Sequence, residues 1–138
     1  MLLVAIQKDT QFKSFPSVLQ NIFQNLCENA IFFSQFNKKS RPKVDVNVSQ
    51  YEKGGLHLSV IDNGCGIHPD VQDKIWDMFF VGNELSKGNG LSLYITKKAV
   101  ESLNGTIHLK TKVDEYTEFS ILFPELQIPQ LPLKNQSL

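Results

Sequence analysis

Residues 44–67 read VDVNVSQYEKGGLHLSVIDNGCGI, and this stretch decides the fold that the flanking segments must join. Over residues 44–49, valines alternate with polar residues, which is the pattern of a strand with one buried face. A turn at Lys53-Gly54-Gly55 separates this strand from a second apolar run at residues 56–61. Two strands joined by a glycine turn predict an antiparallel hairpin. The acidic residue Asp62 follows the second strand directly.

On both sides of the hairpin, apolar residues recur at helical spacing. A first helix is predicted over residues 17–35, directly after Pro16, whose missing N–H fits the first turn of a helix. A second long helix is predicted over residues 91–103, where Asn104-Gly105 follows as a typical stop signal. Between the hairpin and this helix, Pro69 is expected to open a short helix that contains Val71, Ile75, Trp76 and Phe79.

Strands complete the pattern near the two ends of the chain. One is predicted at Leu2 to Ile6, and a last hairpin is predicted from Thr106 to Lys112 and from Thr117 to Phe123. This order of elements predicts an α+β fold, a two-layer sandwich with helices on one face of a mixed sheet. A chain of 138 residues fits one domain, which we expect at 1–124, followed by a loosely ordered tail at 125–138.

Composition excludes several classes of protein. Fourteen basic and fourteen acidic side chains cancel, so charge predicts no broad surface for nucleic acid or for an anionic membrane. No run of apolar residues approaches the length of a membrane span. With only two cysteines, a disulfide framework is not expected, and the reducing cytosol is the predicted compartment.

The segment Asp62-Asn63-Gly64-Cys65-Gly66-Ile67 carries the first chemical signal, because it joins an acid at a strand end to two glycines. Glycine lets a ligand approach the backbone closely. A carboxylate held there can accept a hydrogen bond from an exocyclic amine, which would select adenine over guanine. The same Asp-Asn-Gly triplet is also common in exposed turns, and that interpretation stays open.

The second signal lies on the first predicted helix. Asn25 and Asn29 are four residues apart and therefore share one helical face, with Glu28 alongside. An amide oxygen is a hard ligand that suits Mg²⁺, which takes few protein ligands together with substrate phosphates. An ordinary polar helix face remains the alternative.

The third signal is Lys87-Gly88-Asn89-Gly90-Leu91-Ser92-Leu93, immediately before the second long helix. Backbone N–H groups at a glycine-flanked helix start form an anion site through unpaired donors and the helix dipole. The segment lacks the third glycine of a dinucleotide fingerprint, and no P-loop motif occurs anywhere in the chain. A flexible loop is the alternative.

Taken in order, these signals resemble the motif series of the ATP-binding domain of sensor histidine kinases. The series consists of Asn29, then Asp62-x-Gly64-x-Gly66, then Phe79-Phe80, then Gly88-x-Gly90-Leu91. That domain belongs to the superfamily of gyrase, heat-shock-chaperone and mismatch-repair ATPases. The resemblance covers about residues 1–124, and it implies a five-stranded mixed sheet with ATP held between the helices and a mobile lid at 81–89.

The resemblance also implies roles for individual residues. Asn29 is expected to bind Mg²⁺, with Asn25 and Glu28 beside it as candidate catalytic positions, and Asp62 is expected to read the adenine. The expected nucleotide-binding residues are Asn29, Asp62, Gly64, Gly66, Ile67, Phe79, Lys87, Gly88, Gly90 and Leu91.

The implied function is Mg-ATP binding and transfer of the γ-phosphoryl group to a histidine on a separate dimerisation domain, with a response regulator as the downstream partner. In hydrolytic members of the superfamily a glutamate takes the position of Asn25, so slow hydrolysis is expected here. Two departures, Phe32 in place of a common lysine and Ser92 in place of a glycine, leave a degenerate nucleotide-binding scaffold as an alternative. A serine-phosphorylating anti-sigma regulator is another. A cytoplasmic domain is expected, within a longer protein that can be membrane-anchored.

Overall fold

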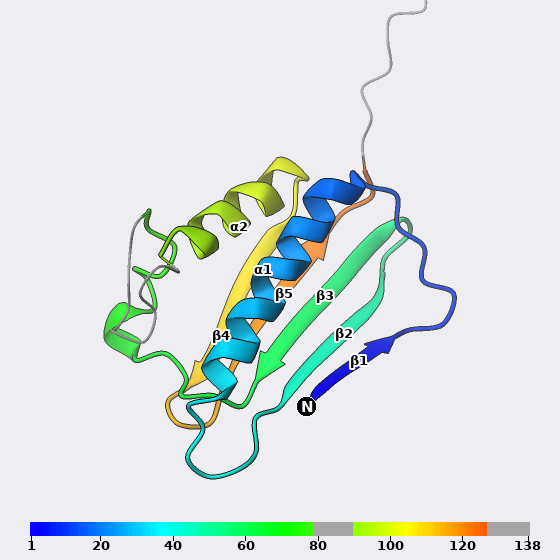
Figure 1. Cartoon of the computed structure of the whole chain (residues 1–138). Coiled ribbons are helices and arrows are strands. Elements are labelled where there is room, and N and C mark those ends of the chain that lie inside the picture. Colours follow the sequence, from blue (N-terminus) through cyan, green and yellow to red (C-terminus); the bar gives the residue numbers. More distant parts are fainter. Residues whose placement is uncertain (79–89, 127–138) are drawn as a thin grey trace, which may run out of the picture.

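The computed structural model describes residues 1–78 and 90–126, which form two layers (Figure 1). One layer is a sheet, and the other consists of two α-helices that cover one face of it. In chain order the elements are β1 (Leu2–Ile6), α1 (Pro16–Ser34), β2 (Val44–Tyr51), β3 (Gly55–Asp62), a 3₁₀ turn (Pro69–Val71), α2 (Gly90–Ser102), β4 (Thr106–Lys112) and β5 (Tyr116–Phe123).

The sheet has five strands in the order β1-β2-β3-β5-β4. β1 runs parallel to β2, whereas the β2–β3, β3–β5 and β4–β5 pairs are antiparallel. The predicted α+β sandwich with a mixed five-stranded sheet is therefore confirmed. This order makes β3 the central strand of the sheet. Its last residue, Asp62, therefore has a neighbouring strand on each side.

The hairpin of β2 and β3 forms as its alternation predicts. Val44 and Val46 are buried beneath the helices, and Val60 lies opposite Val46 on the same face. At the turn, the backbone takes a left-handed conformation at Glu52 and at Gly54, with φ of 50° and 79°. Gly54 thus closes the hairpin in a conformation that glycine adopts more readily than residues with a side chain do.

Both helices bury one apolar face against the sheet. α1 begins at Pro16 and packs on β2 and β3, while α2 packs on β4 and against α1. None of the helices among the described residues combines the length and the apolar character that crossing a membrane requires. The hydrophobic core unites both layers; its fully or almost fully buried members include Ile22, Leu26, Ala30, Val44, Val46, Val60, Val100, Ile121 and Phe123.

One local expectation was wrong. The segment after Pro69 forms only the short 3₁₀ turn, and residues 72–78 continue as irregular turns in which Ile75 is buried and Trp76 packs edge-on against Phe119. Phe79 lies outside the described residues. The apolar spacing there reflects contacts with the sheet, not a continuous helix.

The end of α2 confirms the predicted stop signal at Asn104-Gly105. Asn104, with φ of 59°, takes the left-handed conformation that ends the helix, and the N–H of Gly105 donates to the carbonyl of Val100 at 2.9 Å. Gly105 is required for a different reason. A Cβ atom at this position would lie 2.8 Å from the ring of Phe123 and 2.9 Å from Cγ1 of Val100.

Replacing Gly105 and Asn104 separately distinguishes packing from backbone conformation. We expect Gly105→Ala to lower the free energy of unfolding by about 1–3 kcal/mol, because the new methyl group overpacks a buried contact. Asn104→Gly is the matched control and should change stability by less than about 1 kcal/mol, because glycine tolerates the left-handed conformation. Urea denaturation measures both; equal stability of Gly105→Ala and wild type would contradict the packing argument.

Candidate functional site

The Asp62 carboxyl group lies at the end of β3, on the face of the sheet that carries the helices. It is only 3% exposed, and its Oδ1 accepts a hydrogen bond of 2.9 Å from the backbone N–H of Gly64. Burial raises the pKa of Asp62 to about 6, and the hydrogen bond from Gly64 opposes this effect without cancelling it. A buried carboxyl group at a strand end, held by its own loop, is a strong candidate for a binding group.

The two glycines after Asp62 let the loop pass close to neighbouring backbone. A Cβ atom on Gly64 would lie 2.5 Å from the carbonyl oxygen of Phe33, at the C-terminal end of α1. Gly66 has a φ of 69°, and a Cβ atom there would collide with the carbonyl oxygen of Lys112. The loop therefore fits tightly between α1 and the turn that joins β4 to β5.

Asn63 fastens this loop to the segment that follows α1. Its side-chain oxygen accepts from the N–H of Lys43 at 2.8 Å, and its amide group donates to the carbonyl of Arg41 at 2.8 Å. From the other side, the amide of Asn37 donates to the carbonyl of Asn63. These bonds hold the backbone immediately after Asp62, so they help to position its carboxyl group. Neither Asn37 nor Asn63 was predicted as a site residue from the sequence.

Two threonines from the last hairpin form a hydroxyl pair on the same side of the sheet as Asp62. Thr117 is the direct cross-strand partner of Asp62 and is buried. Its Oγ1 lies 3.0 Å from Oγ1 of Thr111, which donates to the carbonyl of Tyr116 and accepts from the N–H of Ile67. Because the hydroxyl hydrogen of Thr111 is used by Tyr116, Thr117 is the donor within the pair. Its oxygen lone pairs are then oriented by this bond.

From the sequence, Thr111 and Thr117 were predicted only as members of the last two strands, and neither was predicted as a site residue. Thr117 lies opposite Asp62 because of the register between β3 and β5, and the sequence patterns do not give that register. Ile67, which was expected near the nucleotide, is half-buried, and its backbone is tied to β4 through Thr111.

The polar residues of α1 that were predicted as site residues lie in two different environments. Asn25 donates to Oγ1 of Thr96 in α2 at 3.4 Å, so this asparagine faces the neighbouring helix. Asn29 follows one turn later on the same face and is half-buried. Glu28 lies on the exposed side of the helix, where it accepts from Gln24 at 2.9 Å. The structure thus groups Asn25 with Asn29 and separates Glu28 from them.

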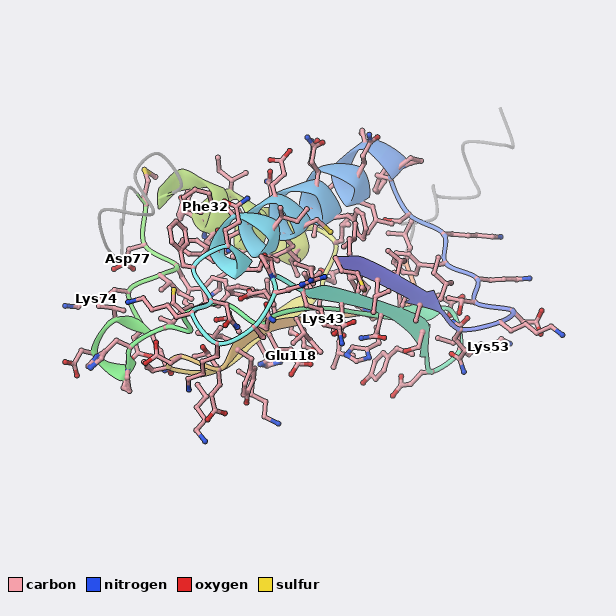
Figure 2. The ribbon with its side chains drawn as sticks, turned by 60° about the horizontal axis from the view of Figure 1, so that its bottom comes forward. Phe32, Lys43, Lys53, Lys74, Asp77 and Glu118 are labelled. Atoms are coloured by element: carbon pink, nitrogen blue, oxygen red, sulfur yellow. The ribbon has the colours of Figure 1, made fainter. Side chains whose placement is uncertain are left out.

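The same helix face continues into an aromatic cluster. The ring of Phe32 packs edge-on against Phe33 at 5.1 Å and against Phe36 at 5.3 Å, measured between ring centroids. Figure 2 shows Phe32 at the C-terminal end of α1, on the side toward the segment that carries Asp77. The surface beside Asn29 is therefore aromatic, and the last turn of α1 holds no basic residue.

Several predicted site residues cannot be placed in this geometry. Phe79, Lys87 and Gly88 lie outside the described residues, as does the whole of the expected lid, Val81 to Asn89. Gly90 is the first residue of α2, with Leu91 next, so the predicted start of this helix is confirmed, and its role as an anion site stays a prediction.

Comparison with known proteins identifies the family. Residues 16–127 match the family described as "Histidine kinase-, DNA gyrase B-, and HSP90-like ATPase". The chain is 29% identical over 126 residues to a probable C4-dicarboxylate sensor kinase of Bacillus subtilis, and this match covers 88% of the chain and 23% of the relative. It is 28% identical over 122 residues to the histidine protein kinase SaeS of Staphylococcus aureus, covering 85% of the chain and 34% of SaeS. The chain thus spans between about a quarter and a third of the length of these curated relatives.

Solved structures show the same fold. The mycobacterial sensor histidine kinase MprB is similar with a TM-score of 0.74 at 24% identity, covering 89% of this chain and 82% of that one. The full-length ShkA structure in complex with AMPPNP is similar with a TM-score of 0.75 at 21% identity, covering 94% of this chain and 27% of ShkA.

Comparing wild type with Asp62→Asn at several pH values measures the cost of burying the carboxyl group. The pKa of Asp62 rises from 3.8 to about 6 on folding, so between these values the folded protein holds the proton more tightly than the unfolded chain. Asp62 therefore contributes stability that is fully present below the lower value and is lost as pH rises through the upper one. Relative to Asp62→Asn, the free energy of unfolding of wild type should fall by about 2–3 kcal/mol between pH 4 and 7.5.

Urea denaturation at each pH gives this difference directly, since titrations elsewhere in the chain cancel between the two proteins. Parallel stability profiles for wild type and Asp62→Asn would contradict a buried carboxyl group with a raised pKa.

Proposed function

The chain belongs to the family of histidine kinase-, DNA gyrase B- and HSP90-like ATPases, and we propose that it is the ATP-binding catalytic domain of a sensor histidine kinase. The family match implies ATP binding. The observation that carries the finer proposal is the buried carboxyl group of Asp62 at the end of β3, whose loop lies against the C-terminal end of α1. The identity of the curated relatives as sensor kinases supports the choice of a kinase within the family.

Asp62 supplies the base recognition in this proposal. Above pH 6 its carboxylate accepts a hydrogen bond from the exocyclic amine of adenine, and guanine presents a carbonyl at that position. Because Gly64 and Asn63 fix the loop, the carboxylate is oriented before the ligand binds. The buried hydroxyl of Thr117 lies on the neighbouring strand and adds a second polar group at the same level of the sheet.

Asn29 is the residue that would hold Mg²⁺. Its amide oxygen suits a hard cation, and the half-buried position lets the side chain reach a ligand between α1 and α2. The cation, when bound, neutralises phosphate charge, and phosphoryl transfer depends mainly on such positioning and neutralisation. Gly88, Gly90, Leu91 and Lys87 are proposed to contact the phosphates at the start of α2.

The side chains around Asn29 also bear on the choice between transfer and hydrolysis. Asn25, one turn before Asn29, has an amide that cannot take a proton from water at neutral pH. The carboxylate of Glu28 points to the exposed side of α1. Slow hydrolysis suits a kinase whose nucleophile is a histidine, which we propose to lie on a separate dimerisation domain, with a response regulator downstream. We also propose that the domain works in the cytoplasm, where its two free cysteines stay reduced.

A nucleotide-binding scaffold without transfer activity is the second candidate, and the cluster of Phe32, Phe33 and Phe36 favours it. Aromatic rings beside Asn29 cannot neutralise phosphate charge, so the site would depend on other cations for transfer. The two candidates differ in whether a phosphoryl group leaves the bound nucleotide.

Nucleotide titrations test the role of Asp62. Wild type with Mg²⁺ should bind ATP at least about tenfold more tightly than GTP, and Asp62→Asn should lose about 10–100-fold in ATP affinity, the range for a hydrogen bond to a charged group. Glu118→Gln is the matched control, because this carboxylate lies on the opposite face of the sheet (Figure 2). Calorimetry measures the affinities. Equal binding of ATP and GTP, or unchanged ATP binding by Asp62→Asn, would overturn the assignment.

A transfer assay separates the kinase from the scaffold. When a histidine-containing dimerisation domain of a related kinase is supplied with Mg-ATP, we expect acid-labile phosphate on its histidine, and at least a tenfold lower rate with Asn29→Ala. Asn47→Ala, at an exposed position of β2, is the matched control. ATP binding without any labelled protein would favour the scaffold, whereas acid-stable phosphoserine on a partner would favour the anti-sigma regulator.

A further inference from the structure

The peptide group that joins Asn63 to Gly64 lies beside the Asp62 carboxyl group and is held at both of its polar atoms. Its N–H, which belongs to Gly64, donates to Oδ1 of Asp62 at 2.9 Å. Its carbonyl, which belongs to Asn63, accepts from the side-chain amide of Asn37. Because a peptide group is planar, the direction of the carbonyl fixes the direction of the N–H. The orientation of the Asp62 carboxyl group is therefore linked to Asn37.

This peptide group needs a constraint from outside, because a glycine follows it. Gly64 has no Cβ atom and tolerates a wide range of backbone dihedral angles, so it does little to resist rotation of the peptide plane. The other half of Asn63 is fixed separately. Its N–H donates to the carbonyl of Lys43 at 3.2 Å, and its side-chain oxygen accepts from the N–H of Lys43 at 2.8 Å. The bond from Asn37 holds the carbonyl side.

Asn37 is itself fixed, so it can act as this constraint. Its backbone N–H donates to the carbonyl of Ser34, the last residue of α1, at 3.3 Å. Its side-chain oxygen accepts from the N–H groups of Lys39 and Ser40 at 2.6 and 2.8 Å. Since both lone pairs of this oxygen are used, the amide plane is held and its nitrogen is directed at the Asn63 carbonyl. A chain of hydrogen bonds thus runs from the end of α1 to Asp62.

On the basis of the proposed role of Asp62 in binding adenine, we propose that Asn37 is a positioning residue for base recognition. Through the Asn63–Gly64 peptide group, it orients the Asp62 carboxylate toward the exocyclic amine of the base. Hydrogen bonds in a chain polarise one another, so the bond from Asn37 also strengthens the N–H of Gly64 as a donor. A fixed carboxylate favours adenine, because guanine presents a carbonyl at that position. Asn37 thus contributes to the preference for ATP over GTP.

A residue that only stabilised the fold would have a different effect. Loss of general stability would weaken the binding of ATP and of GTP alike, so the ratio of the two affinities would stay the same. A positioning residue acts on the group that distinguishes the two bases. Its loss changes the ratio.

The variant Asn37→Asp isolates the bond in question. The new carboxylate keeps an oxygen that accepts from Lys39 and Ser40, but it has no hydrogen to donate to the Asn63 carbonyl. By calorimetry with Mg²⁺, we expect ATP to bind about three- to tenfold more weakly, the range for one hydrogen bond, and GTP to bind within about twofold of wild type. Asn37→Ala, which adds no charge, should change the ratio of affinities in the same direction.

Gln50→Glu is the matched control. The side-chain amide of Gln50 donates to the carbonyl of Gly55 at 2.7 Å, and its side-chain oxygen accepts from the N–H of Gln11 at 2.9 Å. This variant therefore loses an amide donor and gains a charge, as Asn37→Asp does, but about 20 Å along the strands from Asp62. The ratio of ATP to GTP affinity should equal that of wild type.

Amide exchange of the nucleotide-free chain gives a readout that does not depend on the role of Asp62 in binding. Urea denaturation measures the free energy of global unfolding, and exchange rates are corrected for any change in it. Exchange at Gly64 should then be at least about fivefold faster in Asn37→Asp and Asn37→Ala than in wild type and Gln50→Glu, because the peptide group is released.

Two results would overturn the proposal. One is unchanged exchange at Gly64 in both variants of Asn37. The other is an unchanged ratio of ATP to GTP affinity in both variants while Asp62→Asn abolishes the preference for ATP. If wild type binds ATP and GTP equally, the proposed function fails, whereas faster exchange at Gly64 would still support the part of Asn37 in holding the peptide group.

Discussion

The candidate site depends on the burial of one carboxyl group. Removing Asp62 from water is unfavourable for its charged form, and this is why its pKa rises to about 6. The hydrogen bond from Gly64 offsets only part of that cost. A group that weakens the fold at neutral pH is expected where binding requires it, because a ligand donor can compensate the desolvated charge.

The surrounding structure serves to hold that carboxyl group in one position. Asn63 fastens the loop to the segment after α1, and Gly64 lets the loop approach Phe33 closely. α1 contributes twice: Ile22 and Leu26 on its apolar face fix it to the sheet, while the half-buried Asn29 on its polar face is the residue proposed to bind Mg²⁺. The geometry of the site therefore depends on the same helix–sheet packing that stabilises the fold.

Sequence periodicity predicted the elements whose signal is local. The valine alternation over 44–49 predicts a strand, and the apolar face of residues 17–35 predicts a helix. Neither prediction needs information from the rest of the chain. Features set by tertiary contacts could not be read in this way. Residues 72–78 have helical spacing but form turns against the sheet, and the close packing of Gly105 on Phe123 and Val100 depends on contacts that only the fold creates. Motif order identified Asp62, but its burial, and its pairing with Thr117, required the register of β3 and β5.

The central claim is that Asp62 binds the adenine base. The most direct test is a crystal structure with Mg²⁺ and a non-hydrolysable adenine nucleotide. The account predicts a carboxylate oxygen of Asp62 within about 3 Å of the exocyclic amine of adenine, with the phosphates toward Asn29 and the start of α2. A base bound elsewhere, or a carboxyl group that makes no contact with the bound nucleotide, would contradict it.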